Sequence, residues 1–219
     1  MTVVAIDGPV ASGKSTVAER VAERLGFVYL DTGAMYRAVG LLATEAGLPL
    51  DDEAAVVAAA RAARLRFDRD GRLFAGSREL GDAIRTLAMG AAASRVSALP
   101  GVRALLVEEQ RRLAAGADVV MEGRDIGTNV FPDAAVKVFL TARPEVRAAR
   151  RCAELRSRGE QVDETGVLAA LVERDRRDSG RAVAPLRKAD DAVEVDSSLM
   201  TLDEVVEAVV GLVRERTAP

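Results

Sequence analysis

The residues most suited to chemistry in this chain form a short glycine-rich loop near its start. Residues 8–15 read Gly-Pro-Val-Ala-Ser-Gly-Lys-Ser, which matches the Walker A pattern G-x-x-x-x-G-K-S/T. In such a loop the backbone N–H groups converge on phosphate oxygens, the lysine adds positive charge and the serine hydroxyl can ligate Mg²⁺. The predicted triphosphate-binding residues are Gly8, Pro9, Val10, Ala11, Ser12, Gly13, Lys14, Ser15 and Thr16, with Ser15 as the metal ligand.

The flanking sequence supports this interpretation. Val3–Ile6 reads as a buried strand before the loop, and Ser15–Leu25 reads as a helix after it, which is the context that the motif requires. The helix would add its N-terminal dipole to the phosphate site. The motif alone indicates a nucleoside triphosphate, and it leaves open a kinase, a switch GTPase or a transport ATPase.

The rest of the chain alternates between apolar runs and longer helical patterns. The short runs, rich in valine, isoleucine or phenylalanine, are Val3–Ile6, Phe27–Leu30, Val119–Met121, Val136–Leu140 and Val193–Val195. The helical patterns include Ser15–Leu25, Ala34–Ala46, Val102–Ala115, Pro144–Arg156, Thr165–Ser179 and Leu202–Arg216. Strands that read as buried on both faces, separated by helices, predict a three-layer α/β domain with a parallel sheet.

One segment interrupts this alternation. Arg64–Leu80 contains a hairpin signal at Asp70-Gly71 and a second turn signal at Gly76-Ser77. Short antiparallel strands inserted into a parallel α/β domain usually form a separate lobe. We place that lobe at residues 62–100.

Charged side chains follow two of the predicted strands. The second strand runs into Leu-Asp-Thr-Gly-Ala-Met-Tyr-Arg at residues 30–37, and the third into Met-Glu-Gly-Arg-Asp-Ile-Gly-Thr at residues 121–128. Ligands of doubly wound sheets bind beyond the carboxyl ends of the strands. Arg37, Arg124 and Asp125 are therefore expected to converge near Lys14. A later arginine-rich block, residues 173–186, reads Glu-Arg-Asp-Arg-Arg-Asp-Ser-Gly-Arg-Ala-Val-Ala-Pro-Leu.

Together these blocks resemble those of the bacterial cytidylate kinase (CMP kinase) family over essentially the whole chain. The late block is highly specific for that family, whereas the phosphate loop is not. The resemblance implies one P-loop kinase domain spanning residues 1–219, with a five-stranded parallel sheet. It also implies that the antiparallel insert belongs to the monophosphate-binding region and that residues 143–181 form a helical lid. The implied reaction is Mg²⁺-dependent transfer of phosphate from ATP to CMP, and also to dCMP.

The resemblance also implies roles for individual residues. Lys14, Arg124, Arg147 and Arg151 would be catalytic. CMP would be bound by Thr32, Tyr36, Arg37, Ser94, Arg103, Arg124, Asp125, Arg174, Asp178 and Arg181. Arg147, Arg150 and Arg151 would share one face of a lid helix, and which of them neutralises the migrating phosphoryl group is left open. A metal role for Glu122 is also open, because many family members have aspartate there. Asp7 reads as a structural residue at a strand end.

General chemistry supports the same interpretation. Phosphoryl transfer passes through a loose transition state, so catalysis depends on positioning and charge neutralisation. A monophosphate acceptor has a second pKa of about 6 and is already largely dianionic near neutral pH. It therefore needs no general base, whereas several arginines are needed to hold the phosphates in line. A carboxylate that accepts from the cytosine amino group, beside an arginine that donates to the ring, would favour cytosine over uracil. The resemblance implies this role for Ser94, Arg103 and Asp125.

Composition excludes several other classes of protein. The 219 residues contain no histidine and one cysteine, Cys152, which excludes a Ser-His-Asp triad, a His-ligated metal and an intrachain disulfide. The net charge is −3, so nucleic acid is not an expected partner. No apolar run approaches the roughly 18 residues of a membrane span. These features predict a cytoplasmic protein, and we expect a monomer.

Two other classes of P-loop protein fit the sequence less well. Shikimate and thymidylate kinases share the loop and the sheet, but they explain neither the insert nor the Arg-Ala-Val-Ala-Pro-Leu ending. A GTPase switch would carry an Asn-Lys-x-Asp segment that reads guanine. The single asparagine, Asn129, is followed by Val130, so the sequence does not support that class.

Overall fold

The computed structural model describes residues 1–68 and 71–218. These residues form two compact units, one of Met1–Tyr29 with Gly116–Pro219 and the other of Leu30–Ala115. The predicted lobe at residues 62–100 falls within the second unit. The predicted hairpin at Asp70-Gly71 includes Asp70, which lies outside the described residues.

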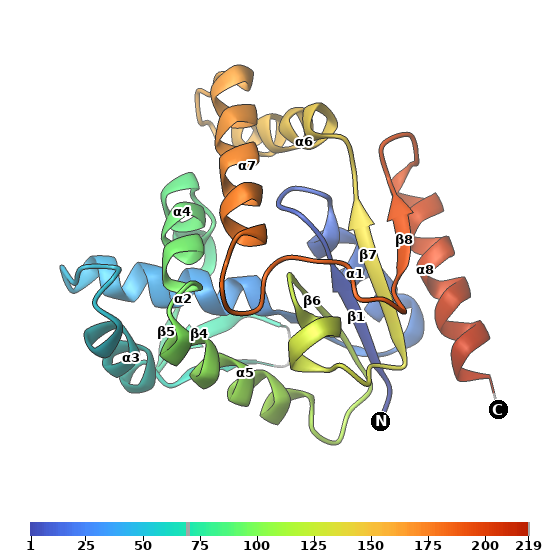
Figure 1. The fold of residues 1–219 in the computed structure, drawn as a ribbon, viewed down its shortest axis with the longest axis horizontal. Helices are drawn as coiled ribbons and strands as arrows, with labels where there is room; N and C mark the ends of the chain where they lie inside the picture. Colours follow the sequence, from blue (N-terminus) through green and yellow to red (C-terminus); the bar gives the residue numbers. More distant parts are fainter. Residues whose placement is uncertain (69–70, 219) are drawn as a thin grey trace. The chain divides into compact units, whose positions relative to one another are not determined.

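A five-stranded parallel sheet organises the first unit (Figure 1). Its strands, in sheet order, are β2 (Val28–Asp31), β6 (Val119–Gly123), β1 (Val3–Asp7), β7 (Val136–Thr141) and β8 (Val193–Asp196). All five predicted strands are confirmed, and each extends one or two residues further at its carboxyl end. The chain leaves the first unit within β2. The sheet register places Ile6 opposite Glu122 and Asp7 opposite Gly123, which brings the start of the phosphate loop beside the Gly-Arg-Asp block.

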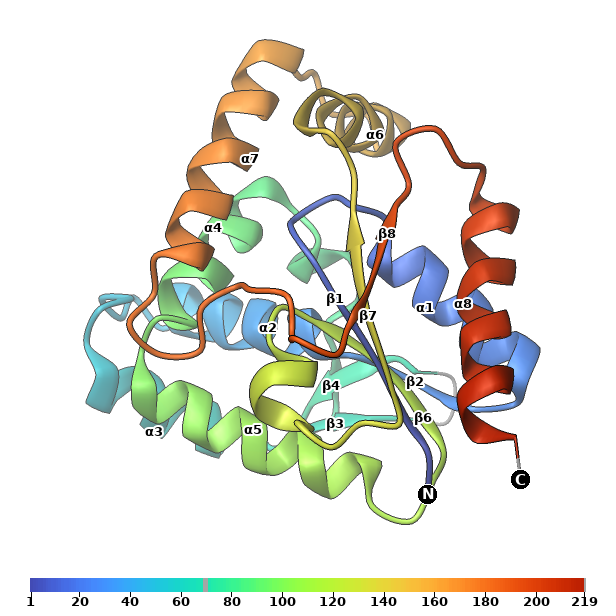
Figure 2. The same ribbon diagram turned by 45° about the vertical axis from the view of Figure 1, so that its right-hand side comes forward.

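The helices of this unit form two groups. Helices α1 (Lys14–Leu25) and α8 (Leu202–Thr217) contact each other beside the sheet (Figure 2). Their valines share one apolar core with the strands, as Val17, Val21 and Val209 illustrate. Helices α6 (Pro144–Ser157) and α7 (Glu164–Ser179) pack against each other around a smaller core of their own. A short π-helix, η2 (Ile126–Val130), follows β6.

The second unit combines helices with a small antiparallel sheet, in the strand order β3-β4-β5. Its elements are α2 (Thr32–Glu45), α3 (Glu53–Ala62), β3 (Leu65–Phe67), β4 (Leu73–Ala75), β5 (Arg78–Glu79), η1 (Gly81–Ile84), α4 (Leu87–Val96) and α5 (Pro100–Ala114). Helices α2 and α4 lie close together at Gly40, where an added Cβ would be 2.9 Å from the Ala92 Cβ. The three-stranded sheet agrees with the predicted antiparallel insert.

Several helix boundaries differ from the sequence-based prediction. Helix α2 begins at Thr32, two residues before the expected start, because the Asp31 side chain caps it by accepting from the Ala34 N–H at 2.8 Å. Helix α5 begins at Pro100, a residue suited to the first turn. Helices α3 and α4 were not predicted from the sequence. No helix in residues 1–68 and 71–218 has both the length and the apolar character needed to cross a bilayer.

Candidate active site

The phosphate loop joins the end of β1 to the start of α1. Gly8 is essential to its path, because a Cβ there would lie only 2.0 Å from the Leu140 carbonyl oxygen. Gly13 caps α1 in a left-handed conformation (φ 94°), and no side chain of the described residues caps this helix end. The amino end of α1 therefore presents main-chain N–H groups with a favourable dipole for an anion.

Lys14 folds back onto this loop. Its Nζ donates to the carbonyl oxygen of Pro9 at 2.6 Å and to the Ser12 hydroxyl at 3.3 Å, and its side chain is buried. Burial and the nearby Arg124 lower the pKa of Lys14 to about 7, against the opposing effect of Glu122. A bound phosphate would supply negative charge and shift this pKa back upward.

Ser15, the predicted metal ligand, is joined to Glu122 at the end of β6. The serine hydroxyl donates to Glu122 Oε1, and the Tyr29 hydroxyl donates to the same oxygen at 3.2 Å. Glu122 is buried. No three Asp, Glu, Cys or His side chains of the described chain form a metal cluster. A hydroxyl and one carboxylate nevertheless suit Mg²⁺, which binds few protein oxygens and completes its shell with water and phosphate.

Asp7 anchors the loop that follows β6. Its two carboxylate oxygens accept from the backbone N–H groups of Ile126 (2.9 Å) and Gly127 (2.8 Å). Burial raises the pKa of Asp7 to about 6, although the two N–H donors oppose that shift. An added Cβ on Gly127 would lie 3.1 Å from the Lys137 side chain and 3.5 Å from the carboxylate. Asp7 thus holds in place the segment that carries Arg124 and Asp125, in keeping with its predicted structural role.

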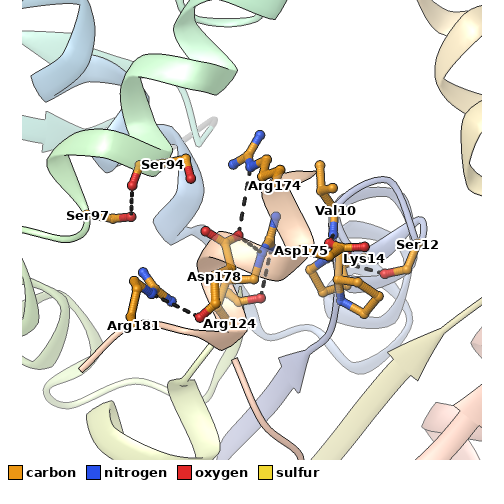
Figure 3. Close-up of polar contacts among 12 residues, drawn as sticks. Val10, Ser12, Lys14, Ser94, Ser97, Arg124, Arg174, Asp175, Asp178 and Arg181 are labelled. Atoms are coloured by element: carbon orange, nitrogen blue, oxygen red, sulfur yellow. Dashed lines mark hydrogen bonds and ion pairs between the residues drawn. The ribbon is translucent and has the colours of Figure 1, made fainter. Parts of the chain in front are cut away.

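A cluster of arginines surrounds Asp178 (Figure 3). Asp178 Oδ2 lies 3.4 Å from Arg124 Nε and 3.8 Å from Arg174 Nε, and Arg181 Nε donates to the Asp178 carbonyl oxygen at 3.2 Å. The Asp178 side chain is only 4% exposed. Three guanidinium groups thus lie around one aspartate, two at its carboxylate and one at its carbonyl oxygen, and this excess of positive charge suits an anionic ligand. Arg124 and Arg174 also lower the pKa of Lys14, so this cluster and the loop act on each other electrostatically.

Asp125, the predicted reader of cytosine, is buried beside Arg124. Its Oδ2 accepts from the Asn129 side-chain amide at 3.1 Å. Its carbonyl oxygen accepts from the backbone N–H groups of Asn129 and Val130. The π-helix therefore folds around Asp125 and fixes its main chain.

Five predicted CMP-binding residues belong to the second unit: Thr32, Tyr36, Arg37, Ser94 and Arg103. Arg37 pairs with Asp31 at 2.8 Å, and Gly33 leaves room for that pair. The Arg103 guanidinium lies 5.7 Å from the centre of the Tyr36 ring and donates to the Ser97 carbonyl oxygen at 3.4 Å. Residues of α2 and α5, with the residue that caps the carboxyl end of α4, thus form one polar cluster within this unit. The expected approach of Arg37 to Lys14 stays a prediction.

The three arginines predicted to share a face of α6 have different partners. Arg147 is buried and donates to the carbonyl oxygens of Ala142 and Val10, both at 2.9 Å, and to Asp175 at 2.6 Å. Arg150 donates to the Ser197 carbonyl oxygen at 2.7 Å and to its hydroxyl at 3.0 Å. Arg151 pairs with Glu154 on its own helix at 2.6 Å.

Asp175 and Tyr29 contact the site although the sequence predicted no role for either. Asp175 lies three residues before Asp178 on α7, a spacing at which two side chains are neighbours on a helix surface. The sequence did offer one signal for Asp175, because it lies inside the arginine-rich block at residues 173–186, which is highly specific for the family. Tyr29 gave no comparable signal, because its contact with Glu122 spans 93 residues of sequence.

Comparison with known proteins shows which proteins this chain is similar to. The cytidylate kinase family model matches residues 4–215. A cytidylate kinase of Geobacter sp. (strain M21) is 47% identical over 219 residues, covering 99% of this chain and 94% of its own. That of Pelotomaculum thermopropionicum is 48% identical, covering 96% and 95%. Among solved structures, a shikimate kinase from Acinetobacter baumannii aligns with a TM-score of 0.51 at 13% identity, covering 100% of this chain and 96% of its own, which shows the shared fold alone.

Proposed function

The chain belongs to the cytidylate kinase family and transfers a phosphoryl group from ATP to CMP. On this basis we propose a role in the reaction for each residue of the site. The phosphate loop, residues 8–16, binds the triphosphate of ATP. Lys14 leaves the Pro9 carbonyl and places its charge between the β- and γ-phosphates, where negative charge develops. The amino end of α1 stabilises the same phosphates.

The use of ATP implies a divalent cation, and we propose Mg²⁺. Ser15 and Glu122 would hold it, Ser15 directly and Glu122 directly or through water, and their oxygen donors fit its preference. The cation would neutralise charge on the β- and γ-phosphates. The Tyr29 hydroxyl keeps the Glu122 side chain in position for this role.

The acceptor phosphate is held by Arg37, Arg124 and Arg181, with help from Thr32. Three arginine side chains can align a dianion with the γ-phosphate without strong mutual repulsion. CMP is already ionised near neutral pH and attacks without a general base. The chemistry therefore needs no histidine, in agreement with the composition.

The nucleoside part of CMP is recognised by the remaining residues. Arg174 and Asp178 bind the ribose hydroxyls, and dCMP is a second acceptor. Ser94, Arg103 and Asp125 read the base, and Tyr36 supports Arg103 from the side. A carboxylate opposite the cytosine amino group disfavours uracil, which has a carbonyl in that place.

The lid arginines act in two ways. Arg147 is proposed to act through the phosphate loop, since it is bonded to Val10 and Asp175. Arg151 exchanges Glu154 for the migrating phosphoryl group once both nucleotides are bound. Charge neutralisation of this kind accounts for much of the catalysis in phosphoryl transfer.

The observation that carries this function is the arginine cluster around Asp178 in the same compact unit as the Lys14 loop. An assay of ADP release, run with CMP, dCMP, UMP, AMP, GMP, dTMP and shikimate as acceptors, tests it. CMP and dCMP should give the highest kcat/KM, with little ATP hydrolysis when no acceptor is present. A preference for shikimate or dTMP would contradict the assignment.

We further propose that the protein works as a monomer in the cytoplasm, where both nucleotides are found. Its net charge of −3 does not favour nucleic acid as a partner. Light scattering coupled to size-exclusion chromatography should give the mass of one chain, 23.2 kDa, with or without nucleotides.

A further inference from the structure

Both backbone groups of Val10 in the phosphate loop are bound by one ion pair. Asp175 of α7 accepts from the Val10 N–H at 3.2 Å, and Arg147 of α6 donates to the Val10 carbonyl oxygen at 2.9 Å. The same Arg147 nitrogen pairs with Asp175 at 2.6 Å. Figure 3 shows Asp175 directed toward Val10. The pair therefore closes a ring of contacts around one peptide segment of the loop.

Apolar packing joins the same parts of the chain. The side chains of Val10 and Ala11 pack against the small core formed by α6 and α7, which contains Cys152 and Leu171. Ala11 adopts a left-handed conformation (φ 59°) that is unusual for a residue with a Cβ. Such a conformation persists where surrounding contacts hold it, and here they come from the two lid helices.

Helix α7 also carries residues of the arginine cluster. Arg174 directly precedes Asp175, and Asp178 follows it by three residues, close to one helical turn. Asp178 faces Arg124 and Arg174 (Figure 3). The two carboxylates thus have separate partners, since Asp175 contacts the phosphate loop and Asp178 contacts the arginines assigned to the acceptor.

We propose that Asp175 is a positioning residue that couples the two nucleotide sites of the enzyme. With ATP in the loop, the segment at Val10 is fixed, and through Asp175 it holds α7 with Arg174 and Asp178 in the arrangement that binds CMP. Without Asp175 the loop and the helix move independently. The inference rests on the proposed roles of Arg174 and Asp178 at the ribose. By thermodynamic linkage, CMP must strengthen ATP binding by the same factor.

The test measures coupling rather than activity alone. Calorimetry gives the Kd of CMP with and without a saturating non-hydrolysable ATP analogue and Mg²⁺, for wild type, Asp175→Ala and Asp175→Asn. In the wild type the analogue should tighten CMP binding by about fivefold or more, and in Asp175→Ala by less than about twofold. Asp175→Asn keeps the size and an acceptor for Val10 but loses the ion pair, so its factor should lie between them.

Glu173→Ala is the matched control. Glu173 is an exposed carboxylate on the same helix, and it pairs with Arg176 at 2.9 Å, away from the phosphate loop. This variant should keep the wild-type coupling factor. If Asp175→Ala fails to fold, Asp175→Asn carries the test, with thermal unfolding as its folding check.

Three results would overturn the inference: no coupling in the wild type, wild-type coupling in both Asp175 variants, or an equal loss in Glu173→Ala. None of these affects the proposed function, provided that the wild type binds CMP and forms CDP. A wild type that forms no CDP would reject the proposed function itself, and the inference with it, so the two failures are distinguishable.

Discussion

The ammonium group of Lys14 donates to the carbonyl oxygen of Pro9, 2.6 Å away, inside the loop that binds phosphate. The lysine thus has an internal partner that holds it close to where the phosphates bind. The Ser12 hydroxyl, its second partner, belongs to the same loop. These two hydrogen bonds hold the Lys14 side chain against its own loop.

Lys14→Ala should lower kcat/KM on the order of 10³-fold or more, because a charge partner of the transition state is removed. Its circular dichroism spectrum should match that of the wild type. Lys188→Ala is the control, since Lys188 is exposed and pairs with Glu194 at 3.2 Å. Near-normal turnover in Lys14→Ala would reject the kinase mechanism.

Binding of ATP should be accompanied by proton uptake. Burial lowers the pKa of Lys14 to about 7, so at pH 8 most of the lysine is neutral before the nucleotide binds. The triphosphate favours the charged form, so the bound protein holds the proton more tightly and affinity should fall as pH rises above 7. Calorimetry at pH 8 in buffers of different ionisation enthalpy should show uptake of roughly one proton. Uptake of the same size in Lys14→Ala would show that another group takes up the proton.

Asp7 should give the protein a distinct dependence of stability on pH. Burial raises its pKa to about 6 in the folded chain, so the native state binds this proton more tightly than the unfolded state does. Above pH 6 the buried carboxylate is ionised and destabilises the folded state. This destabilisation disappears as the pH falls toward 4 and the carboxylate takes up its proton. When the pH is lowered from 7.5 to 4, the free energy of unfolding of the wild type should therefore rise by about 2 kcal/mol relative to that of Asp7→Asn.

Urea unfolding of both proteins at the two pH values measures this difference, because groups common to both cancel. Equal changes in the free energy of unfolding of the wild type and of Asp7→Asn between the two pH values would contradict this prediction. Asp7→Asn should also reduce kcat/KM, because one of its two acceptors for the Ile126 and Gly127 N–H groups is lost.

Asp125→Asn tests how the base is read. A charge-assisted hydrogen bond from the cytosine amino group is worth roughly 1.5–3 kcal/mol, or about 10- to 150-fold in discrimination. The wild type should prefer CMP and dCMP to UMP by a factor in this range. The variant keeps the size of the side chain but can turn its NH₂ toward uracil O4. Its activity with CMP should fall, and its preference over UMP should narrow or reverse.

The measurement is kcat/KM with CMP and UMP for both proteins, with Asp133→Asn as an exposed control after the same π-helix. An unchanged CMP:UMP ratio, together with a general loss of activity, would assign Asp125 to the loop scaffold. The main role of the Asp125 side chain would then be its hydrogen bond with the Asn129 amide.

The lid region should become more protected when both nucleotides bind. Enclosing two anionic substrates requires that water be excluded, or ATP would be hydrolysed without transfer. Amide hydrogen exchange across residues 147–180 should slow on addition of CMP with a non-hydrolysable ATP analogue. Helix α8 serves as an internal reference and should change little. Unchanged exchange throughout residues 147–180 would count against a moving lid.

The parts of the fold that were predictable depend on local pattern. The first four residues of β1 read as an apolar run, as expected for a strand that is buried throughout, and the phosphate loop carries its own signature. Helix α3 was not identified because alanine fills most of Glu53–Ala62, which leaves little contrast between a buried and an exposed face. The cap at Asp31 depends on a local hydrogen bond that the helical pattern alone did not reveal.

The parts of the site that were not predictable depend on distant contacts. Asp175 meets Val10 across 165 residues of sequence, and Ser15 meets Glu122 across 107. Pairings of that kind arise from the strand order and from how α7 packs, which no short motif encodes. The family resemblance supplied ligand roles for Arg174 and Asp178, but it gave none for the residue between them that contacts the loop.

The small core between helices α6 and α7 and the phosphate loop also affects the reactivity of the chain's one thiol. Cys152 is 1% exposed among the side chains that pack against Val10 and Ala11. An alkylating reagent can reach its sulfur only when this core opens, so the alkylation rate reports how often α6 and α7 separate from each other or from the loop. No second cysteine contributes a background reaction. Local opening of this core can therefore be followed by mass spectrometry on the unmodified protein, without an introduced label.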